Sequence, residues 1–259
     1  MVKMVFFDID GTLIAMGKRR MTDRIEETLL RLKENGIHLC IATGRPLREL
    51  PCFGRVQFDA FLTFNGSYCC NRQEVIYANP ICPTDVEQVL NNAEKMHRYV
   101  ALATLHKMGV NGKDPNLEEY LAHASQIINV AEDYDQLKQQ PIYQMMVACS
   151  PEEYTLFTLG TKNVTMTSWS TKAADIIPAN GGKGAAVKKI LDYYGISPDE
   201  TMAFGDGKND IELLQSVGTG IAMGNASEEV KRHAAAICPS VEDDGIYHYC
   251  KKKRFFTES

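Results

Sequence analysis

The sequence predicts an α/β fold: a doubly wound, mostly parallel sheet with a second, smaller α/β domain inserted into it. Short apolar runs alternate with helical patterns at both ends of the chain, and each run ends in polar residues. This alternation changes between about residues 81 and 180. We therefore expect a core of residues 1–80 and 181–259, and an inserted domain of residues 81–180 with a typical module size.

The first strand is predicted over residues 4–7, where four consecutive apolar residues precede Asp8, Asp10 and Gly11. A wholly apolar run suits a central parallel strand, which is covered on both faces. Two acids at positions i and i+2 point the same way while the chain stays extended. The alternative, a surface loop that happens to contain two aspartates, fits a run of this kind poorly.

The remaining elements follow in chain order. A capping signature at Thr22 begins a helix that ends at Asn35-Gly36, and Asn65-Gly66 is a dipeptide that can start a hairpin. In the core, further strands are expected over residues 37–42, 59–64, 201–204, 220–223 and 235–238, and a helix over 183–194. In the inserted domain, helices are expected over residues 84–97, 117–128 and 151–159, and strands over 142–148 and 164–169.

Composition narrows the class of protein. The chain has 259 residues, of which 44% are hydrophobic and 24% charged, as in ordinary globular proteins. No apolar run reaches the roughly 18 residues that a membrane span needs, and no signal-like start is present, so we expect a cytoplasmic protein that binds no membrane. The net charge of −5 argues against nucleic acid as a partner. The eight cysteines form no CxxC pair, which predicts reduced, packed thiols.

Polar residues at the predicted strand ends should meet in one crevice, because ligands bind there in doubly wound sheets. Several aspartates gathered in one place require a cation, and their hard oxygen ligands favour Mg²⁺. A lysine and a hydroxyl group suit a phosphoryl group. One aspartate could attack phosphorus while another exchanges protons with the leaving oxygen and then with water. The residues concerned are Asp8, Asp10, Thr43, Gly44, Arg45, Asn65, Lys183, Asp206, Asn209 and Asp210.

These residues also resemble a known family. The segments 8–12, 42–45 and 205–210, together with Lys183, resemble in order and spacing the four motifs of the haloacid dehalogenase superfamily. The chain is most similar to its Cof-type sugar-phosphate phosphatases over the whole length. The late insertion, after residue 65, matches the α/β cap that closes over the crevice in that type. Such caps tend to set substrate choice in the family.

The resemblance implies a role for each matching residue. Asp8 would be the nucleophile and Asp10 the general acid/base. Asp8, Asp206 and the main-chain carbonyl of Asp10 would hold Mg²⁺. The residues implied in substrate and phosphate binding are Thr43, Gly44, Arg45, Lys183 and Asn209, with Thr12 and Asp210 in support. The presence of Asp10 favours phosphate esters, because carbon–halogen members of the superfamily lack an acid there.

The favoured function is Mg²⁺-dependent hydrolysis of a small phosphate monoester, most often a sugar phosphate, through an aspartyl-phosphate intermediate. Two alternatives stay open: a phosphomutase, which returns the phosphoryl group to the substrate, and a binding module that keeps the fold without turnover. The partner is a small phosphorylated metabolite, and the chain is expected as a monomer or small homo-oligomer. The substrate itself cannot be read from the inserted domain.

Several features have competing interpretations. Arg45 is equally a contact to substrate or cap or a structural ion-pair partner, and Asn65-Gly66 is equally a turn or part of the site. Residues 109–114 are expected to form a surface turn and residues 241–245 an exposed loop beside the site mouth. The remaining expectations assign core positions to Met145, Met146 and Trp169, a solvated helix face to residues 251–254, and no role to the six histidines.

Overall fold

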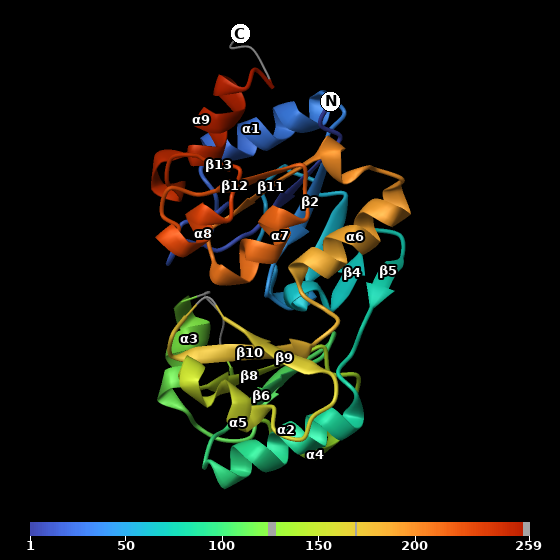
Figure 1. Cartoon of the computed structure of the whole chain (residues 1–259), viewed down its shortest axis with the longest axis vertical. Helices are drawn as coiled ribbons and strands as arrows, with labels where there is room; N and C mark the ends of the chain where they lie inside the picture. Colours follow the sequence, from blue (N-terminus) through green and yellow to red (C-terminus); the bar gives the residue numbers. More distant parts are fainter. Residues whose placement is uncertain (124–127, 169, 256–259) are drawn as a thin grey trace.

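Strand β1 (Met4–Phe7) lies inside the larger of two sheets in the computed structural model, which describes residues 1–123, 128–168 and 170–255. This sheet has the order β13-β12-β11-β1-β2-β3-β4-β5 (Figure 1). Its pairings are parallel from β13 to β3 and antiparallel from β3 to β5, which confirms the predicted mostly parallel α/β sheet. The other strands are β2 (His38–Ala42), β3 (Ala60–Thr63), β4 (Tyr68–Cys70), β5 (Val75–Ala78), β11 (Thr201–Gly205), β12 (Thr219–Ala222) and β13 (Ala236–Ile237).

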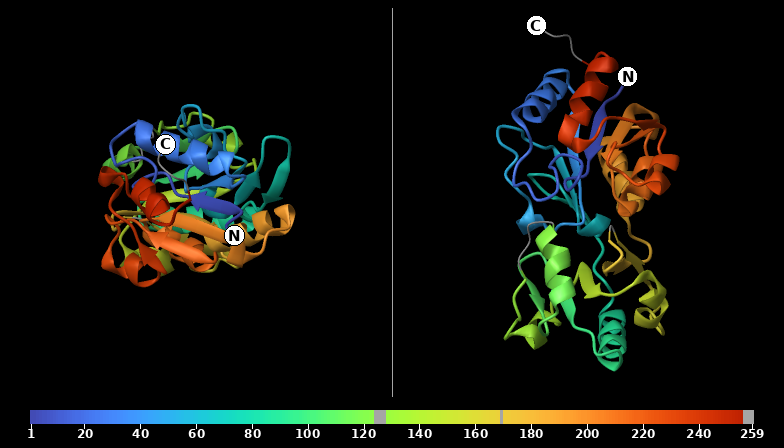
Figure 2. Two further views of the ribbon diagram at one scale, coloured as in Figure 1. Left: turned by 90° about the horizontal axis from the view of Figure 1, so that it is seen from above. Right: turned by 90° about the vertical axis from the view of Figure 1, so that its left-hand side faces the viewer.

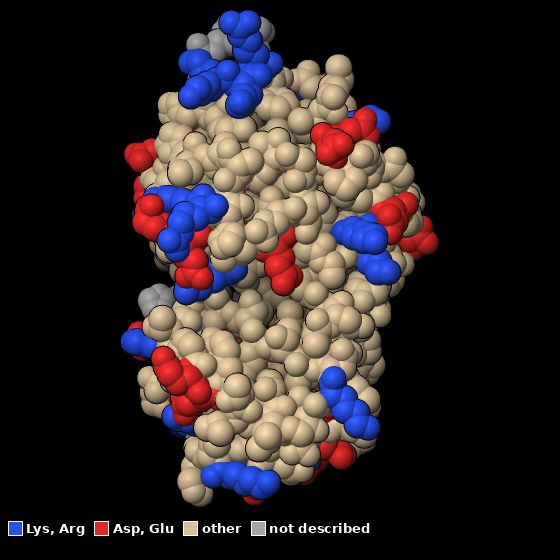
Figure 3. Space-filling view, viewed as in Figure 1, with Lys and Arg blue, Asp and Glu red and all other residues tan. Residues whose placement is uncertain are grey.

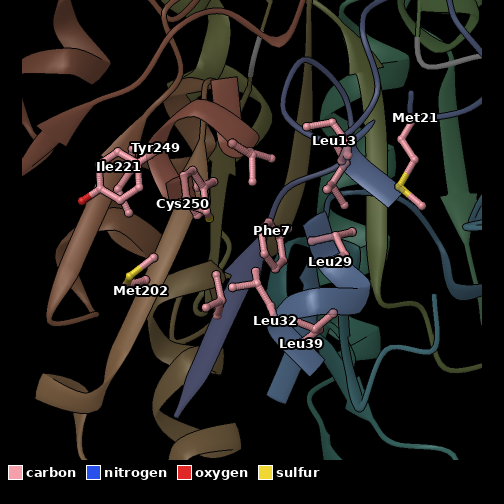
Figure 4. Close-up of a cluster of buried hydrophobic side chains, with 14 of the residues drawn as sticks. Phe7, Leu13, Met21, Leu29, Leu32, Leu39, Met202, Ile221, Tyr249 and Cys250 are labelled. Atoms are coloured by element: carbon pink, nitrogen blue, oxygen red, sulfur yellow. The ribbon is translucent and has the colours of Figure 1, made fainter. Parts of the chain in front are cut away.

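Helices cover both faces of this sheet because its strands are apolar on both sides. Val5 and Phe7 pack with α1 (Asp23–Glu34) and α9 (Gly245–Lys252) on one face, as Figure 4 shows for Phe7, Leu29 and Leu32. The opposite face, which holds Met4 and Phe6, packs against the helices α6 (Lys183–Tyr194), α7 (Ile211–Gln215) and α8 (Glu228–Arg232) (Figure 2). Consecutive residues of β1 therefore serve two separate hydrophobic clusters, as the period of a strand requires.

The second sheet is antiparallel and has the order β7-β6-β8-β10-β9. We call the part of the chain from α2 to β10, which is built on this sheet, the cap. Its strands are β6 (Val100–Ala103), β7 (Met108–Val110), β8 (Gln144–Ala148), β9 (Val164–Thr167) and β10 (Ala173–Pro178). Its helices are α2 (Pro83–Lys95), α3 (Pro115–His123), α4 (Tyr134–Leu137) and α5 (Tyr154–Phe157).

The cap sheet has one face turned away from the larger sheet and one toward it. Helices α2, α4 and α5 cover the outer face, whereas α3 packs on the inner face together with Phe64 and Tyr68 of the core (Figure 1). The chain passes between the two sheets after β5 and again after β10. The predicted boundaries of the inserted domain fall in these two connections and stay a prediction.

Short antiparallel strands account for most differences from the predicted elements. Strands β4, β5, β6, β7 and β10 were not predicted. The first four have only three or four residues each, and the apolar pattern around β10 has no clear period. The predicted surface turn at residues 109–114 is wrong at its start, since Gly109 and Val110 belong to β7 and are buried. The predicted helix over residues 151–159 is a 3₁₀ turn (Pro151–Glu153) followed by the single turn of α5.

Most predictions for residues 241–254 and for the buried positions are confirmed. Val241 is buried, however, so the expected exposed loop is partly core. Figure 3 shows basic side chains gathered at the end of the molecule near α9, where residues 251–254 are exposed. Met145 and Met146 are buried, whereas Trp169 and the end of the predicted helix 117–128 lie outside the described residues. All eight cysteines are free thiols, six of them buried. Within the described ranges, no helix is long and apolar enough to cross a membrane.

Candidate active site

A cavity of about 320 Å³ lies between the carboxyl ends of the parallel strands and the inner face of the cap sheet. Its volume falls within the range of small-molecule sites. It brings together most of the residues predicted from the strand ends: Asp8, Asp10, Thr43, Gly44, Arg45, Asp206, Asn209 and Asp210. The three other predicted residues stand directly behind this lining, because Lys183 and Thr12 each donate a hydrogen bond to one of its aspartates and Asn65 donates to Gln144 and Asp175.

Lys183 lies at the centre of the buried charges. The residue is 1% exposed, and its Nζ lies 2.7 Å from Oδ1 of Asp8 and 2.5 Å from Oδ1 of Asp210. The second oxygen of Asp210 accepts the backbone N–H groups of Asp206 and Gly207 at 3.0 and 2.9 Å. Asp210 thus fixes both the lysine and the loop after β11.

Burial dominates the protonation of this cluster. It raises the pKa of Asp8 well above the usual range, although Lys183 acts in the opposite direction. Burial and the neighbouring Asp210 raise the pKa of Asp206 to about 7. For Lys183, burial alone would lower the pKa, but the carboxylates of Asp210 and Asp8 reverse the effect and raise it. The site therefore holds more negative charge than its lysine can neutralise.

A divalent cation fits this excess of carboxylates. One oxygen from each of Asp8, Asp206 and Asp210 lies within 4.8 Å of the others. Oδ1 of Asp206 also accepts a hydrogen bond from Thr12 at 2.8 Å, which fixes the orientation of that carboxylate. Gly11 has a φ of +88°, and a Cβ there would lie 2.2 Å from Oδ2 of Asp206. The backbone after β1 thus approaches Asp206 more closely than any other residue would allow.

Arg45 pairs with Asp10 rather than pointing freely into the cavity. Its Nε and Nη2 lie 2.7 and 2.6 Å from the two oxygens of Asp10. Burial would lower the pKa of Arg45, but the hydrogen bond to Asp10 raises it. The structure shows the ion pair with Asp10, and because Arg45 also lines the cavity, a contact with substrate stays a prediction. The partner is itself a predicted catalytic residue.

Asn65 connects the core to the cap. It follows β3 in a 3₁₀ turn (Phe64–Gly66), and both Phe64 and Asn65 have φ values near +50°. Two consecutive non-glycine residues with positive φ have a strained backbone, and such strain clusters at functional sites. The Asn65 amide donates to Oδ2 of Asp175 at 2.8 Å and to Oε1 of Gln144 at 3.2 Å, and its Oδ1 accepts from Asn209 at 3.0 Å. Asn65 is therefore both the turn residue and a site residue.

Sequence reasoning missed the cap's contribution to the cavity. No local motif marks the cap residues that line the cavity, because only the packing of the cap on the core brings them to the site. In the core, Asn225 was also missed; its amide donates to the Gly11 carbonyl at 2.9 Å and lies 3.3 Å from Oδ2 of Asp206. The lining residues that were not predicted are Met16, Tyr120, Leu121, Gln144, Met146, Asp175, Gly207, Lys208, Asn225 and Ser227.

Comparison with known proteins supports the assignment of the fold. The chain is 29% identical over 250 residues to the HMP-PP phosphatase of Citrobacter koseri, covering 89% of this chain and 87% of that protein. It is 25% identical to the 5-amino-6-(5-phospho-D-ribitylamino)uracil phosphatase YitU of Bacillus subtilis, covering 96% of each. Among solved structures, the HAD subclass IIB sugar phosphatase BT4131 superposes with a TM-score of 0.87 at 27% identity, over 98% of this chain and all of the other. Residues 5–250 match the family model of the haloacid dehalogenase-like hydrolases, and the chain belongs to this family.

Proposed function

We propose that this protein is a Mg²⁺-dependent phosphatase that hydrolyses small phosphate monoesters, in particular sugar phosphates. Family membership supports hydrolysis of small phosphorylated compounds. The observation that carries the proposal is the placement of Asp8, whose carboxylate lies 2.7 Å from the buried lysine and within reach of the other acids of the cation cluster. A buried carboxylate between a lysine and a cation site suits a nucleophile that must approach an anionic phosphoryl group.

The reaction proceeds in two steps. An oxygen of Asp8 attacks phosphorus, the ester P–O bond breaks, and Asp10 gives a proton to the leaving oxygen. Asp10 then removes a proton from water, which attacks phosphorus and breaks the bond to Asp8, releasing phosphate. Lys183 and Thr43 hold the phosphoryl oxygens, and Asn209 supports them. Asp8, Asp206 and the Asp10 carbonyl would hold Mg²⁺, which supplies the positive charge that lets two anions meet.

The cap would select the leaving group, because its inner face closes the side of the cavity opposite the acids. Two relatives support small phosphorylated substrates: YitU is named for a phosphoribityl compound, and BT4131 is described as a sugar phosphatase. The residues of this chain that would contact the leaving group come from β8, β10 and α3.

The test is phosphate release from a panel of hexose, pentose, triose, nucleotide and cofactor phosphates, with Mg²⁺ and with EDTA. We expect release that depends on the metal and is concentrated on a few sugar phosphates. Release that is activated by added sugar bisphosphate, with transfer back to sugar, would indicate the mutase instead. Binding of phosphorylated ligands without release from any compound would indicate the binding module.

A further inference from the structure

Lys208 lines the cavity but has no part in the mechanism above. It opens the 3₁₀ turn Lys208–Asp210, which follows β11, and its side chain is 57% exposed. An anionic group on the leaving group of a substrate would meet mostly negative charge in this cavity, and among the lining residues only Arg45 and Lys208 could offset it. Within the described residues, the charged side chains of the lining are Asp8, Asp10, Asp175, Asp206, Asp210, Arg45 and Lys208.

These two cations differ in how firmly they are held. Arg45 cannot move to meet a substrate group, because it is 8% exposed and both oxygens of Asp10 hold its guanidinium group. The Nζ of Lys208 lies 2.6 Å from Oε2 of Glu229, in a pair whose side chains are 57% and 45% exposed. An exposed ion pair of this kind contributes little to stability. Lys208 can therefore exchange Glu229 for another anion.

The side chain of Lys208 lies between the phosphoryl site and the solvent. Lys208 precedes Asn209, which donates to Asn65 and is proposed to support the phosphoryl group. Its partner Glu229 belongs to α8, and Ser227, the residue that caps this helix, also lines the cavity. Because the stem of a lysine is flexible, the ammonium group can turn from Glu229 into the cavity. There it would meet the part of an ester that extends beyond the phosphoryl group.

The present partner of Lys208 indicates which group it would accept. Glu229 supplies a carboxylate, so a carboxylate on the leaving group could replace it with a group of the same charge and geometry. The lysine then stays paired, and the charge of the substrate lies beside a cation. A hydroxyl group is a weaker partner for an ammonium group than a carboxylate is, so a neutral sugar would leave the ion pair in place. A substrate ammonium group would be repelled by Lys208.

We propose that Lys208 is a specificity-determining residue that leaves Glu229 to bind a carboxylate on the leaving group, so that the enzyme favours phosphate esters of sugar acids over neutral sugar phosphates. The proposal rests on the proposed phosphatase function and deepens it, because it names a substrate class for the same site. Glu229 competes with the substrate for the lysine. The two residues therefore have opposite effects on selectivity.

The test compares two esters that differ only at the far end of the carbon chain: 6-phosphogluconate, which ends in a carboxylate, and sorbitol 6-phosphate, which ends in a hydroxyl group. The measured quantity is the ratio of their kcat/KM values with Mg²⁺, 6-phosphogluconate over sorbitol 6-phosphate. Lys208→Met should lower this ratio by about tenfold, mainly through KM for 6-phosphogluconate. Glu229→Gln frees the lysine and should raise the ratio by about threefold. The wild-type ratio should fall between about 50 and about 500 mM salt, because exposed charges are screened.

Lys231→Met is the matched control, because Lys231 forms the neighbouring ion pair with Glu228 on α8 and is not part of the cavity lining. It should leave the ratio unchanged. The same ratio in wild type and Lys208→Met, or a ratio in Glu229→Gln that does not exceed that of the wild type, would overturn the proposal. If the wild type released phosphate from no ester, the proposed function would fail. Calorimetric binding of 6-phosphogluconate would then decide the role of Lys208 separately, with weaker binding expected in Lys208→Met and tighter binding in Glu229→Gln.

Discussion

The guanidinium group of Arg45 binds both carboxylate oxygens of Asp10, in a two-point ion pair with distances of 2.6 and 2.7 Å. Arg45 is only 8% exposed and also donates to the Glu49 carbonyl at 3.1 Å, so its position is fixed by the core. Planar two-point contacts of this kind orient a carboxylate as well as neutralise it. In this arrangement an arginine three residues beyond the end of β2 orients the proposed acid/base.

Replacement of Asp10 should affect substrates according to their leaving groups. Asp10→Asn cannot give a proton to the leaving oxygen, so we expect kcat to fall by about 10²-fold or more for a sugar phosphate. p-Nitrophenyl phosphate has a good leaving group and should be slowed much less in the step that breaks its ester bond. The measurement is kcat for both compounds, with burst kinetics to separate the two steps. Equal slowing of the ester-cleavage step for both would count against the acid role.

Replacement of Asp8 by asparagine should abolish turnover and leave the fold intact. The amide is nearly isosteric but cannot attack phosphorus. Since burial raises the pKa of Asp8 and its neighbours include Asp206 and Asp210, loss of this carboxylate should not lower thermal stability in EDTA. Phosphate release and thermal melts check the two parts. Activity at the wild-type level would remove Asp8 as the nucleophile.

Replacement of Lys183 should destabilise the protein as well as inactivate it. Lys183→Met leaves two buried carboxylates, Asp8 and Asp210, without their cation. Loss of one member of a buried ion pair typically costs about 3–5 kcal/mol, and we expect a decrease in the free energy of unfolding of about 3 kcal/mol or more. Urea unfolding in EDTA measures it. Lys188→Met, on the exposed side of the same helix, is the control and should change stability by less than about 0.5 kcal/mol.

Replacement of Gly11 tests whether metal binding needs the close approach of the loop after β1 to Asp206. In Gly11→Ala, the new Cβ would lie 2.2 Å from Oδ2 of Asp206, so that carboxylate must move. We expect a Mg²⁺ requirement raised by about tenfold or more and a lower melting temperature. Gly17→Ala is a close control, because Gly17 has a similar φ of +76° but nothing within 4 Å of the new Cβ. Equal effects in the two variants would show that backbone strain alone is responsible.

Asp175 should make stability depend on pH. Burial raises its pKa from 3.8 to about 7, although hydrogen bonds from Asn65 and Tyr120 oppose this. The folded state therefore keeps a proton that the unfolded state has lost, and stability falls as pH rises from about 4 to 7. Asp175→Asn removes this pH dependence. The free energy of unfolding of the variant minus that of the wild type should therefore rise between about pH 4 and 7, by about 4 kcal/mol at most, and then level off. Urea unfolding in EDTA at pH 5 and 8 checks it; a difference that does not vary with pH would contradict the expectation.

The core of the site could be predicted from sequence because each residue follows directly from a local pattern. The apolar run before Asp8 marks a buried strand, and Asp206 and Asp210 follow another such run. Parallel strands then bring these ends together without further information. The residue roles, the choice of Mg²⁺, the oligomeric state and the cytoplasmic location stay predictions.

The cap's part of the site could not be predicted in this way. Gln144 and Asp175 lie within apolar stretches, and nothing local distinguishes them from polar residues at a strand edge. Their role depends on how an antiparallel sheet with short strands packs on Asn65. Similarly, the sequence around Arg45 allows a substrate contact and an ion pair equally. Only the structure shows the pairing with Asp10.

The pairing of β1 with β11 has a consequence for how the protein is made. Met4 aligns with Thr201, so one neighbour of the strand that carries Asp8 is synthesised long after it, with the whole cap in between. Phe7 stacks on Phe204 of that late strand at 5.5 Å between ring centroids. A growing chain on the ribosome therefore cannot close its first hydrophobic cluster until about four-fifths of it has emerged. Contacts so distant in sequence slow folding and leave apolar strands exposed meanwhile. We expect chains that end before β11 to aggregate rather than fold.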